Sequence, residues 1–180
     1  FALDMPDNIS VPATISYDFR LLNKEPVNKR LRYVARSNLV YRANLQEAAQ
    51  QIKRGLKLPM QFNPRAQQLA AGWRGAGKDG AGIVDAALSY FRQQGFQYTL
   101  EPPLLGVNSV DDFLFETRKG FCEHYASSFV FLMRAANVPA RVVAGYLGGE
   151  FNDYGNYYIV RQSDAHAWAE VWLAGQGWVR

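Results

Sequence analysis

The stretch Asp164-Ala165-His166-Ala167-Trp168-Ala169-Glu170-Val171-Trp172 is the most regular part of the sequence and gives the main evidence for its fold. Small apolar residues occupy the odd positions from 165 to 171, while the even positions hold His166, Trp168, Glu170 and Trp172. Successive side chains of a strand point to opposite faces, so this alternation predicts a β-strand with two unlike faces. Residues 174–177 then supply a turn, and residues 178–180 begin a return strand.

Two further strands precede this hairpin in the sequence. They are expected at residues 141–146 and 157–161, joined by a loop rich in Gly, Asn and Asp. Before them, residues 126–133 have the apolar spacing of a helix, which Asn137-Val138-Pro139 ends. The last third of the chain therefore reads as one helix followed by several strands.

Cys122 is the single cysteine of the chain and falls at or just before the first turn of this predicted helix. The unpaired N–H groups of a helix N-terminus favour a negative charge, so a thiol placed there ionises readily to the reactive thiolate. Gly120 lets the chain turn without a side chain blocking the sulfur. His166, at the start of a strand, is a suitable general base for this nucleophile.

Structural, non-catalytic interpretations of these residues stay open at this point. A lone buried cysteine is usually an inert small apolar residue, and a lone histidine is more often structural. Cys122 and His124 make no known zinc pattern, so no metal and no cofactor is expected. The tryptophans at 168, 172 and 178 fit the lining of an acyl-binding cleft and a packed sheet face equally well.

The first part of the chain predicts a small β unit. Alternation indicates strands at residues 14–22 and 30–36, with a loop at residues 23–28 and a third short strand at 39–42. Such a unit is too small to be stable alone.

Helical signals follow this unit. Asn44 with Glu47 is expected to cap a first helix, Asn63-Pro64 to open a second that stops at Gly75, and residues 81–94 to form a third. Residues 75–82 lack the GK[ST] ending of a phosphate loop and are interpreted as a linker. A short strand at 96–100 and a helical turn starting at Ser109 complete the pattern.

Composition limits the class of protein. The 180 residues have 48% hydrophobic content, which fits one folded core and excludes a disordered chain. The net charge is +4, with the basic excess gathered between Lys24 and Arg42. That patch fits anionic lipid or cell-wall polymer, or a solvated strand face, and no nucleic-acid recognition motif accompanies it.

One cysteine excludes an intrachain disulfide, and no apolar run is long enough to cross a bilayer. Because the sequence begins with Phe1 and ends within a predicted strand, we expect a longer parent protein.

Three blocks in fixed order resemble the bacterial transglutaminase-like family across about residues 85–180. They are Gly120-Phe121-Cys122-Glu123-His124-Tyr125-Ala126, Val138-Pro139-Ala140-Arg141-Val142-Val143-Ala144-Gly145-Tyr146, and His166-Ala167-Trp168-Ala169-Glu170-Val171-Trp172 with Gly177-Trp178-Val179-Arg180. The preceding segment is similar to that of a membrane-anchored group of the family, the transglutaminase protein A type. The resemblance implies an α+β, papain-like fold in which a Cys-bearing helix packs against an antiparallel sheet.

The resemblance also implies a Cys-His-Asp triad. Cys122 is then the nucleophile and His166 the base, while the family's aspartate falls two positions after Arg180, outside this chain. Asp164 is the nearest carboxylate in sequence, but same-strand neighbours two residues apart diverge along a sheet, so it is a poor substitute. Tyr98 and Trp168 are predicted to line the site.

The implied activity is acyl transfer from a glutamine-type carboxamide to an amine through a thioester. Peptides or proteins bearing glutamine and amine groups are the implied partners, at the periplasmic face of a bacterial inner membrane. The alternatives are a cysteine peptidase or amidase on the same core and a non-catalytic domain that binds cell-wall peptides. We expect a β subdomain at residues 1–43, a helical connector at 44–80 and a truncated catalytic core at 81–180.

Overall fold

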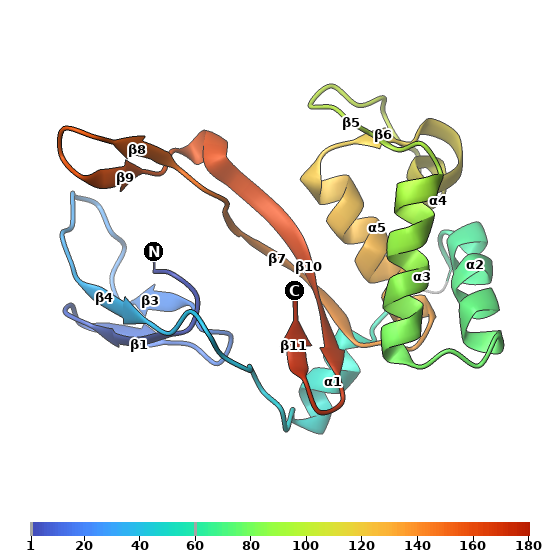
Figure 1. Cartoon of the computed structure of the whole chain (residues 1–180), viewed down its shortest axis with the longest axis horizontal. Coiled ribbons are helices and arrows are strands. Elements are labelled where there is room, and N and C mark those ends of the chain that lie inside the picture. Colours follow the sequence, from blue (N-terminus) through green and yellow to red (C-terminus); the bar gives the residue numbers. More distant parts are fainter. Residues whose placement is uncertain (1, 60) are drawn as a thin grey trace. The chain divides into compact units, whose positions relative to one another are not determined.

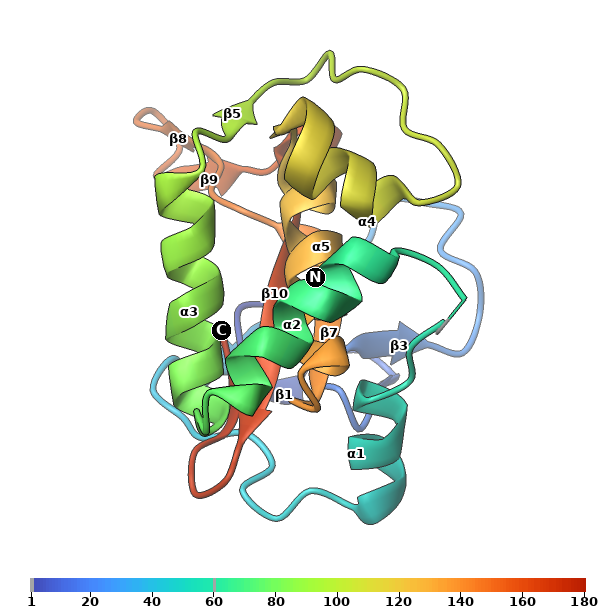
Figure 2. The ribbon, with the colours of Figure 1, turned by 90° about the vertical axis from the view of Figure 1, so that its right-hand side faces the viewer.

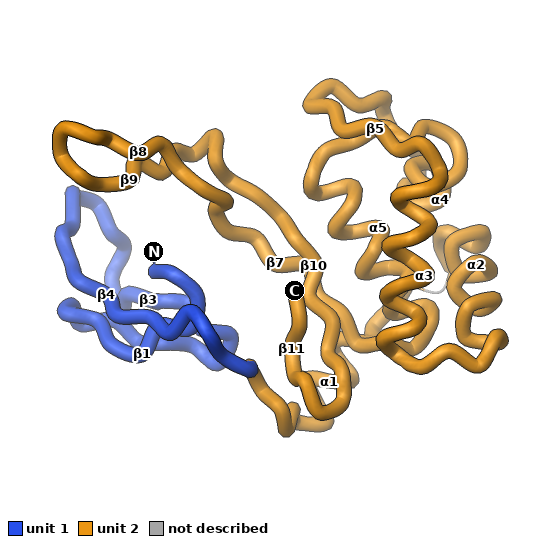
Figure 3. Tube along the Cα trace, viewed as in Figure 1, with its two compact units in different colours: residues 1–42 blue, residues 43–180 orange. Residues whose placement is uncertain are grey.

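The computed structural model describes residues 2–59 and 61–180 and divides the chain into two compact units, residues 1–42 and 43–180 (Figure 3). The first unit holds two antiparallel pairs of strands. β1 (Pro6–Ile9) pairs with β4 (Ala35–Ser37), and β2 (Ala13–Ile15) pairs with β3 (Leu21–Asn23). Among the described residues of this unit, Pro6 alone is buried.

The single strand predicted at residues 14–22 is wrong, because a turn at Ser16–Arg20 folds it into the β2–β3 hairpin. The Ser16 hydroxyl accepts a hydrogen bond from the Arg20 N–H at 2.9 Å and donates one to the Asp18 carboxylate at 2.5 Å. Phe19 has a φ of +61°. Side chains of Ser and Asp that bond locally compete with a strand ladder, which is why the alternation misled. Residues 30–34 and 39–42 are likewise not strands.

The second unit is built around one helix, α5 (Cys122–Ala135). On one side α5 packs against a three-stranded antiparallel sheet in the order β11-β10-β7, formed by Gly177–Val179, Ala165–Leu173 and Ala140–Tyr146. On its other sides lie α2 (Pro64–Gly75) and α3 (Gly80–Gln93) (Figures 1 and 2). The α+β class and the Cys-bearing helix against an antiparallel sheet are confirmed.

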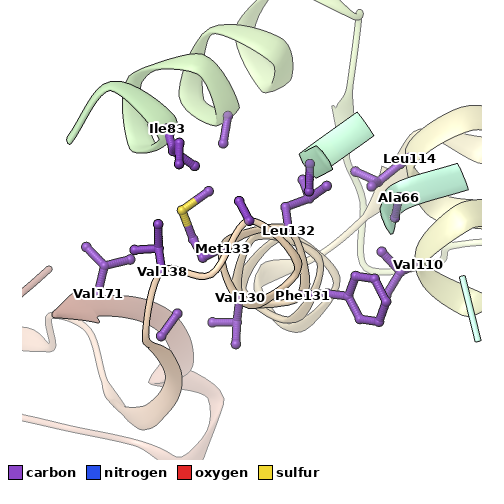
Figure 4. Packing of buried hydrophobic residues seen from close by; sticks show 14 of the residues in the cluster. Ala66, Ile83, Val110, Leu114, Val130, Phe131, Leu132, Met133, Val138 and Val171 are labelled. Carbon is purple, nitrogen blue, oxygen red and sulfur yellow. The ribbon is translucent and has the colours of Figure 1, made fainter. Parts of the chain in front are cut away.

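The core surrounds α5 completely along its second half. Val130, Phe131, Leu132 and Met133 leave the helix in four directions, and all four are buried (Figure 4). A helix that is apolar all round must be buried all round. α5 is therefore the central element of the unit, and its first residue is fixed by packing further along.

Short elements complete the second unit. α1 spans Ala49–Gly55, and β8 (Glu150–Asn152) pairs with β9 (Tyr157–Ile159) inside what the sequence predicted as a loop and a longer strand. β5 (Gln97–Tyr98) pairs in parallel with β6 (Lys119–Gly120). Between them, α4 (Ser109–Asp111) runs into a π-helix over Asp112–Thr117, and a 3₁₀ turn spans Gln162–Asp164.

The predicted N-cap at Asn44 is wrong. Helix α1 begins only at Ala49, and Asn44 has a φ of +53°. The Glu47 carboxylate, expected in a capping box, accepts a hydrogen bond from the indole N–H of Trp178 at 2.7 Å. The same carboxylate oxygen accepts the Asn44 side-chain amide at 3.3 Å, so the two residues do pair, but their bond caps no helix. By contrast, the predicted helix at 81–94, the helix start at Pro64 and the 174–177 turn are confirmed.

Candidate active site

Cys122 is the first residue of α5, and its thiol is half-buried. Phe121 precedes it in an extended conformation, with φ −117° and ψ −173°. The backbone N–H of Phe121 donates to Nδ1 of His124 over 3.4 Å, so His124 caps the start of the helix that carries the thiol. Backbone N–H groups of this first turn give the site the electropositive end of the helix dipole. An anion that develops beside these N–H groups would be stabilised by them.

Gly120 sets the path of the chain into this helix. A Cβ at Gly120 would lie 2.7 Å from Cβ and Cγ of His124 and 3.0 Å from the Phe113 ring. The Gly120 carbonyl accepts the Thr99 N–H at 2.9 Å, which ties the approach to the strand β5. The absence of a side chain is therefore a packing requirement two residues before the thiol.

Tyr98 lies directly across from Gly120 in the parallel β5–β6 pair. Its ring stacks on that of Tyr125, with centroids 6.2 Å apart and an interplanar angle of 22°, and 60% of the residue is exposed. The pKa of Tyr125 is raised above its ordinary value, mainly by burial. The predicted site-lining role of Tyr98 stays a prediction, and its pairing with Gly120 puts it on the strand beside the cysteine loop.

His166 is the second residue of β10, is half-buried, and lies opposite Gly145 of β7. Ala169 and Val171 of β10 pack into the core with α5, so the alternate residues His166, Trp168 and Glu170 belong to the other face of the pleat. Among the hydrogen bonds of residues 2–59 and 61–180, none joins the Cys122 thiol to the His166 imidazole.

Among the hydrogen bonds of the described residues, none joins the Asp164 carboxylate to His166. One of its carboxylate oxygens accepts the Arg161 N–H at 2.7 Å, which closes the 3₁₀ turn before β10. Its backbone carbonyl accepts the Leu147 N–H at 3.1 Å. The group therefore has a structural role at the strand entrance.

The sequence reasoning missed a network of side chains on the His166 face of the sheet. Glu170 forms a partly buried ion pair with Arg141, with 2.6 Å between Oε2 and the guanidinium. The Arg141 guanidinium lies over the Trp178 ring at 4.1 Å, and that of Arg180 lies over the Trp168 ring at 4.4 Å. The signal for this network is cross-strand: opposite charges at 141 and 170 face each other only once the register is known.

A hollow of about 230 Å³ borders the first two turns of α5 on the side of α4, and the cysteine is not among its lining residues. In the described part of the chain, no group of three or more His, Cys, Asp or Glu side chains has the arrangement of a metal site. Nor does any described helix have the length and apolar character of a bilayer span.

Comparison with solved structures gives close matches to one protein. The periplasmic domain of TgpA from Pseudomonas aeruginosa superposes with a TM-score of 0.95, at 45% identity over 99% of this chain and 62% of that one. The same domain bound to ethylmercury gives a TM-score of 0.93. A putative cysteine protease from Cytophaga hutchinsonii, at 21% identity and a TM-score of 0.52, shares the fold.

Curated sequences agree with these structures. A protein-glutamine gamma-glutamyltransferase of Pseudomonas aeruginosa is 46% identical over 99% of this chain, and the Bacillus subtilis protein YebA, uncharacterized, is 41% identical over 53% of it. The chain spans 27% and 14% of the length of these two relatives. The sequence profile of the transglutaminase-like superfamily matches residues 67–180, which include Cys122 and His166. The chain therefore belongs to the transglutaminase-like superfamily.

Proposed function

We propose that this chain is the catalytic part of a cysteine-dependent acyltransferase, with Cys122 as nucleophile and His166 as general base. The observation that carries the proposal is the single thiol at the first residue of α5. It stands in a chain that is 46% identical, over 99% of its length, to a protein-glutamine gamma-glutamyltransferase. A thiol in that position meets the requirement for an activated nucleophile.

The proposed reaction has two halves. His166 takes the thiol proton, and the Cys122 sulfur attacks the carbonyl carbon of a glutamine γ-carboxamide. N–H groups at the start of α5 stabilise the oxyanion. His166 gives the proton to the leaving nitrogen, the C–N bond breaks, and ammonia leaves a thioester. An amine such as a lysine side chain then attacks the thioester, His166 takes its proton, and the C–S bond breaks to give an isopeptide bond and free Cys122.

We further propose that the third member of the triad is the aspartate expected two positions after Arg180. The β10–β11 register supports this placement. Val171 pairs with Val179 and Trp172 with Trp178, so continuing β11 sets that position opposite Trp168. Cross-strand partners share a face, and Trp168 shares its face with His166. A carboxylate there is a diagonal neighbour of the imidazole, whereas Asp164 is engaged elsewhere.

The setting is also proposed. The relative of known structure is described as a periplasmic domain, which supports a periplasmic site of action for this chain. We infer a membrane-anchored parent protein and glutamine-bearing and amine-bearing peptides or proteins as substrates. The exposed basic residues between Lys24 and Arg42 suit contact with an anionic cell-wall polymer or membrane surface.

Amine incorporation tests the proposal directly. A fluorescent primary amine and a glutamine-containing protein are incubated with the 180-residue chain, with a form extended past Arg180 to include the aspartate, and with Cys122→Ala of each. We expect incorporation by the extended form, a rate lower by roughly 10²–10⁴ in the 180-residue chain, and none in either Cys122→Ala variant. Release of ammonia without incorporation would show that water is the acceptor and that the protein is an amidase. If the extended form releases no ammonia, the remaining interpretation is a non-catalytic binding domain.

Alkylation of Cys122 tests the activated thiol without a substrate. We expect iodoacetamide to modify it at neutral pH faster than a free thiol of pKa about 8.5. His166→Gln should lower that rate. A rate equal to that of a free cysteine peptide would remove the support for a nucleophile. Since the chain has one cysteine, the reagent reports on this thiol alone.

A further inference from the structure

The indole of Trp168 lies on Gly145. A Cβ built on Gly145 would be 2.7 Å from Cη2 and 3.0 Å from Cζ3 of Trp168. Gly145 is the residue directly across from His166, and Trp168 pairs with Val143. The ring thus crosses diagonally to β7 and fills the space beside the strand partner of His166.

Three groups hold this ring in place. Gly145 lies beneath it, the Arg180 guanidinium is 4.4 Å from its centroid, and Oε1 of Glu170 accepts its N–H over 3.4 Å. The other carboxylate oxygen of Glu170 accepts Nε of Arg141 at 2.8 Å. Glu170 therefore divides its two oxygens between the indole and the guanidinium.

The network is anchored away from His166. Arg141 and Glu170 have side-chain exposures of 26% and 17%, so their pair is largely shielded from water. Arg141 stacks on Trp178, a buried residue whose indole N–H is held by Glu47 at 2.7 Å. A carboxylate tied into such a network has little freedom to release its second partner.

We propose that Trp168 is a positioning residue for His166 and that Glu170 fixes it in that role. Because the Trp168 indole packs on Gly145, it occupies the space beside His166 on the β7 side. The imidazole is left with the rotamers that lean toward β11, the strand whose continuation carries the proposed aspartate. This inference rests on the proposed function for its effect on rate, but not for its effect on the imidazole.

A double-mutant cycle between Gly145 and Trp168 tests the proposal. Gly145→Ala should push the indole aside and lower kcat by about 10- to 100-fold, with KM within threefold, because misplacing a catalytic group acts on the chemical step. Trp168→Phe removes the two atoms that the new methyl meets. In the Trp168→Phe background, Gly145→Ala should then cost less than threefold. Equal losses of kcat in both backgrounds would show that Gly145 is needed for the backbone conformation and not for the position of the indole, and would overturn the proposal.

Glu170→Gln tests whether Glu170 holds the Trp168 indole in place. Its amide has one acceptor oxygen and cannot serve both Trp168 and Arg141. We expect kcat to fall by about tenfold. The matched control is Glu116→Gln, which also breaks an ion pair, that of Arg65 with Glu116 on an exposed surface. If the two variants have the same kcat, Glu170 has no positioning role.

Imidazole NMR separates this inference from the proposed function. The chain has two histidines, so His166→Gln assigns both signals. In the 180-residue chain, Gly145→Ala and Glu170→Gln should shift or broaden the His166 signals while those of His124 stay unchanged. Unmoved His166 signals would overturn the positioning role whatever the activity. Shifted signals in a protein without transferase activity would support the positioning role and reject the proposed function.

Discussion

Gly120 leaves no room for a methyl group two residues before the thiol. We predict that Gly120→Ala lowers the free energy of unfolding by about 1–3 kcal/mol, since overpacking forces rigid neighbours to move. The displaced neighbour is His124, whose ring caps the Phe121 N–H, so alkylation of Cys122 should slow as well. Chemical denaturation and iodoacetamide kinetics measure the two effects.

Gly72→Ala is the matched control for this substitution. Gly72 lies inside α2, and a Cβ there would meet nothing within 4 Å. Replacing a helix glycine by alanine should stabilise the protein by about 0.5–1 kcal/mol. A Gly120→Ala variant that is as stable as Gly72→Ala would contradict the packing argument.

Tyr90 gives stability a dependence on alkaline pH. Burial raises its pKa above the ordinary 10.0, partly opposed by Arg118 and Arg65, and its hydroxyl donates to the Leu114 carbonyl at 3.2 Å. The folded state therefore holds this proton at pH values where the unfolded state has lost it. Its contribution to stability is complete below pH 10 and declines as pH rises through the folded-state pKa.

We expect Tyr90→Phe to flatten this alkaline decline, measured as the free energy of unfolding between pH 8 and 11. Tyr154→Phe is the control, because Tyr154 is fully exposed and should leave the slope unchanged. Identical slopes in the two variants would rule out Tyr90 as the source. Tyr125, whose pKa is also raised by burial, would then be the next residue to replace.

At the scale of elements, α2 and α4 cap each other. The buried Asp111 carboxylate accepts the N–H groups of Arg65 and Ala66 at 3.0 and 2.8 Å, at the start of α2. Asn63 in turn accepts the N–H groups of Val110 and Asp111 at 3.0 and 3.2 Å, at α4. The start of α2 is thus satisfied by the last residue of α4, and the N–H groups of α4 by the residue that precedes α2.

Asp111→Ala should therefore cost more than an ordinary cap. We predict a loss of about 2–4 kcal/mol in the free energy of unfolding, because two buried N–H groups lose their acceptor. Asp79→Ala removes an exposed cap that serves the Gly82 N–H alone and should cost about 1 kcal/mol. Thermal and urea unfolding of both variants compare them. Equal losses would mean that solvent replaces Asp111.

These contacts also show what the sequence predicts well. The helix at residues 80–93 and the strand at 165–173 keep one periodicity throughout, and both were placed within one residue. Cys122 and His166 could be proposed from the sequence because each lies in a local pattern. The contacts of Glu170, Arg141 and Gly145 could not be predicted, because they depend on which residue of β7 faces which residue of β10. The strand predicted at 14–22 is wrong because local hydrogen bonds of Ser16 form a turn, and the cap at Asn44 is wrong because α1 begins only at Ala49.

At the scale of the molecule, the sheet is tied to residues well before the profile match at 67–180. The carbonyl of Ala43 accepts the Trp178 N–H at 2.9 Å, and that of Asn44 accepts the Trp172 indole N–H at 3.0 Å. We predict that residues 49–180 are less stable than residues 43–180 by at least about 2 kcal/mol, since these donors and the Glu47 contact of Trp178 lose their partners. Differential scanning calorimetry of the two forms measures it, and coincident transitions would contradict it.

The π-helix at Asp112–Thr117 has a consequence for comparing relatives. Its last bond joins the Arg118 N–H to the Phe113 carbonyl, five residues back, so this turn contains one residue more than an α-helical turn. Deleting one residue here would give an ordinary α-helical turn and change the direction in which the chain leaves it by about 100°, which the residues before the packed helix α5 would have to absorb. The segment leads directly through Gly120 to Cys122. A one-residue insertion or deletion between 112 and 117 is therefore expected to disturb the approach to the proposed nucleophile, and gaps placed there in an alignment matter more than substitutions.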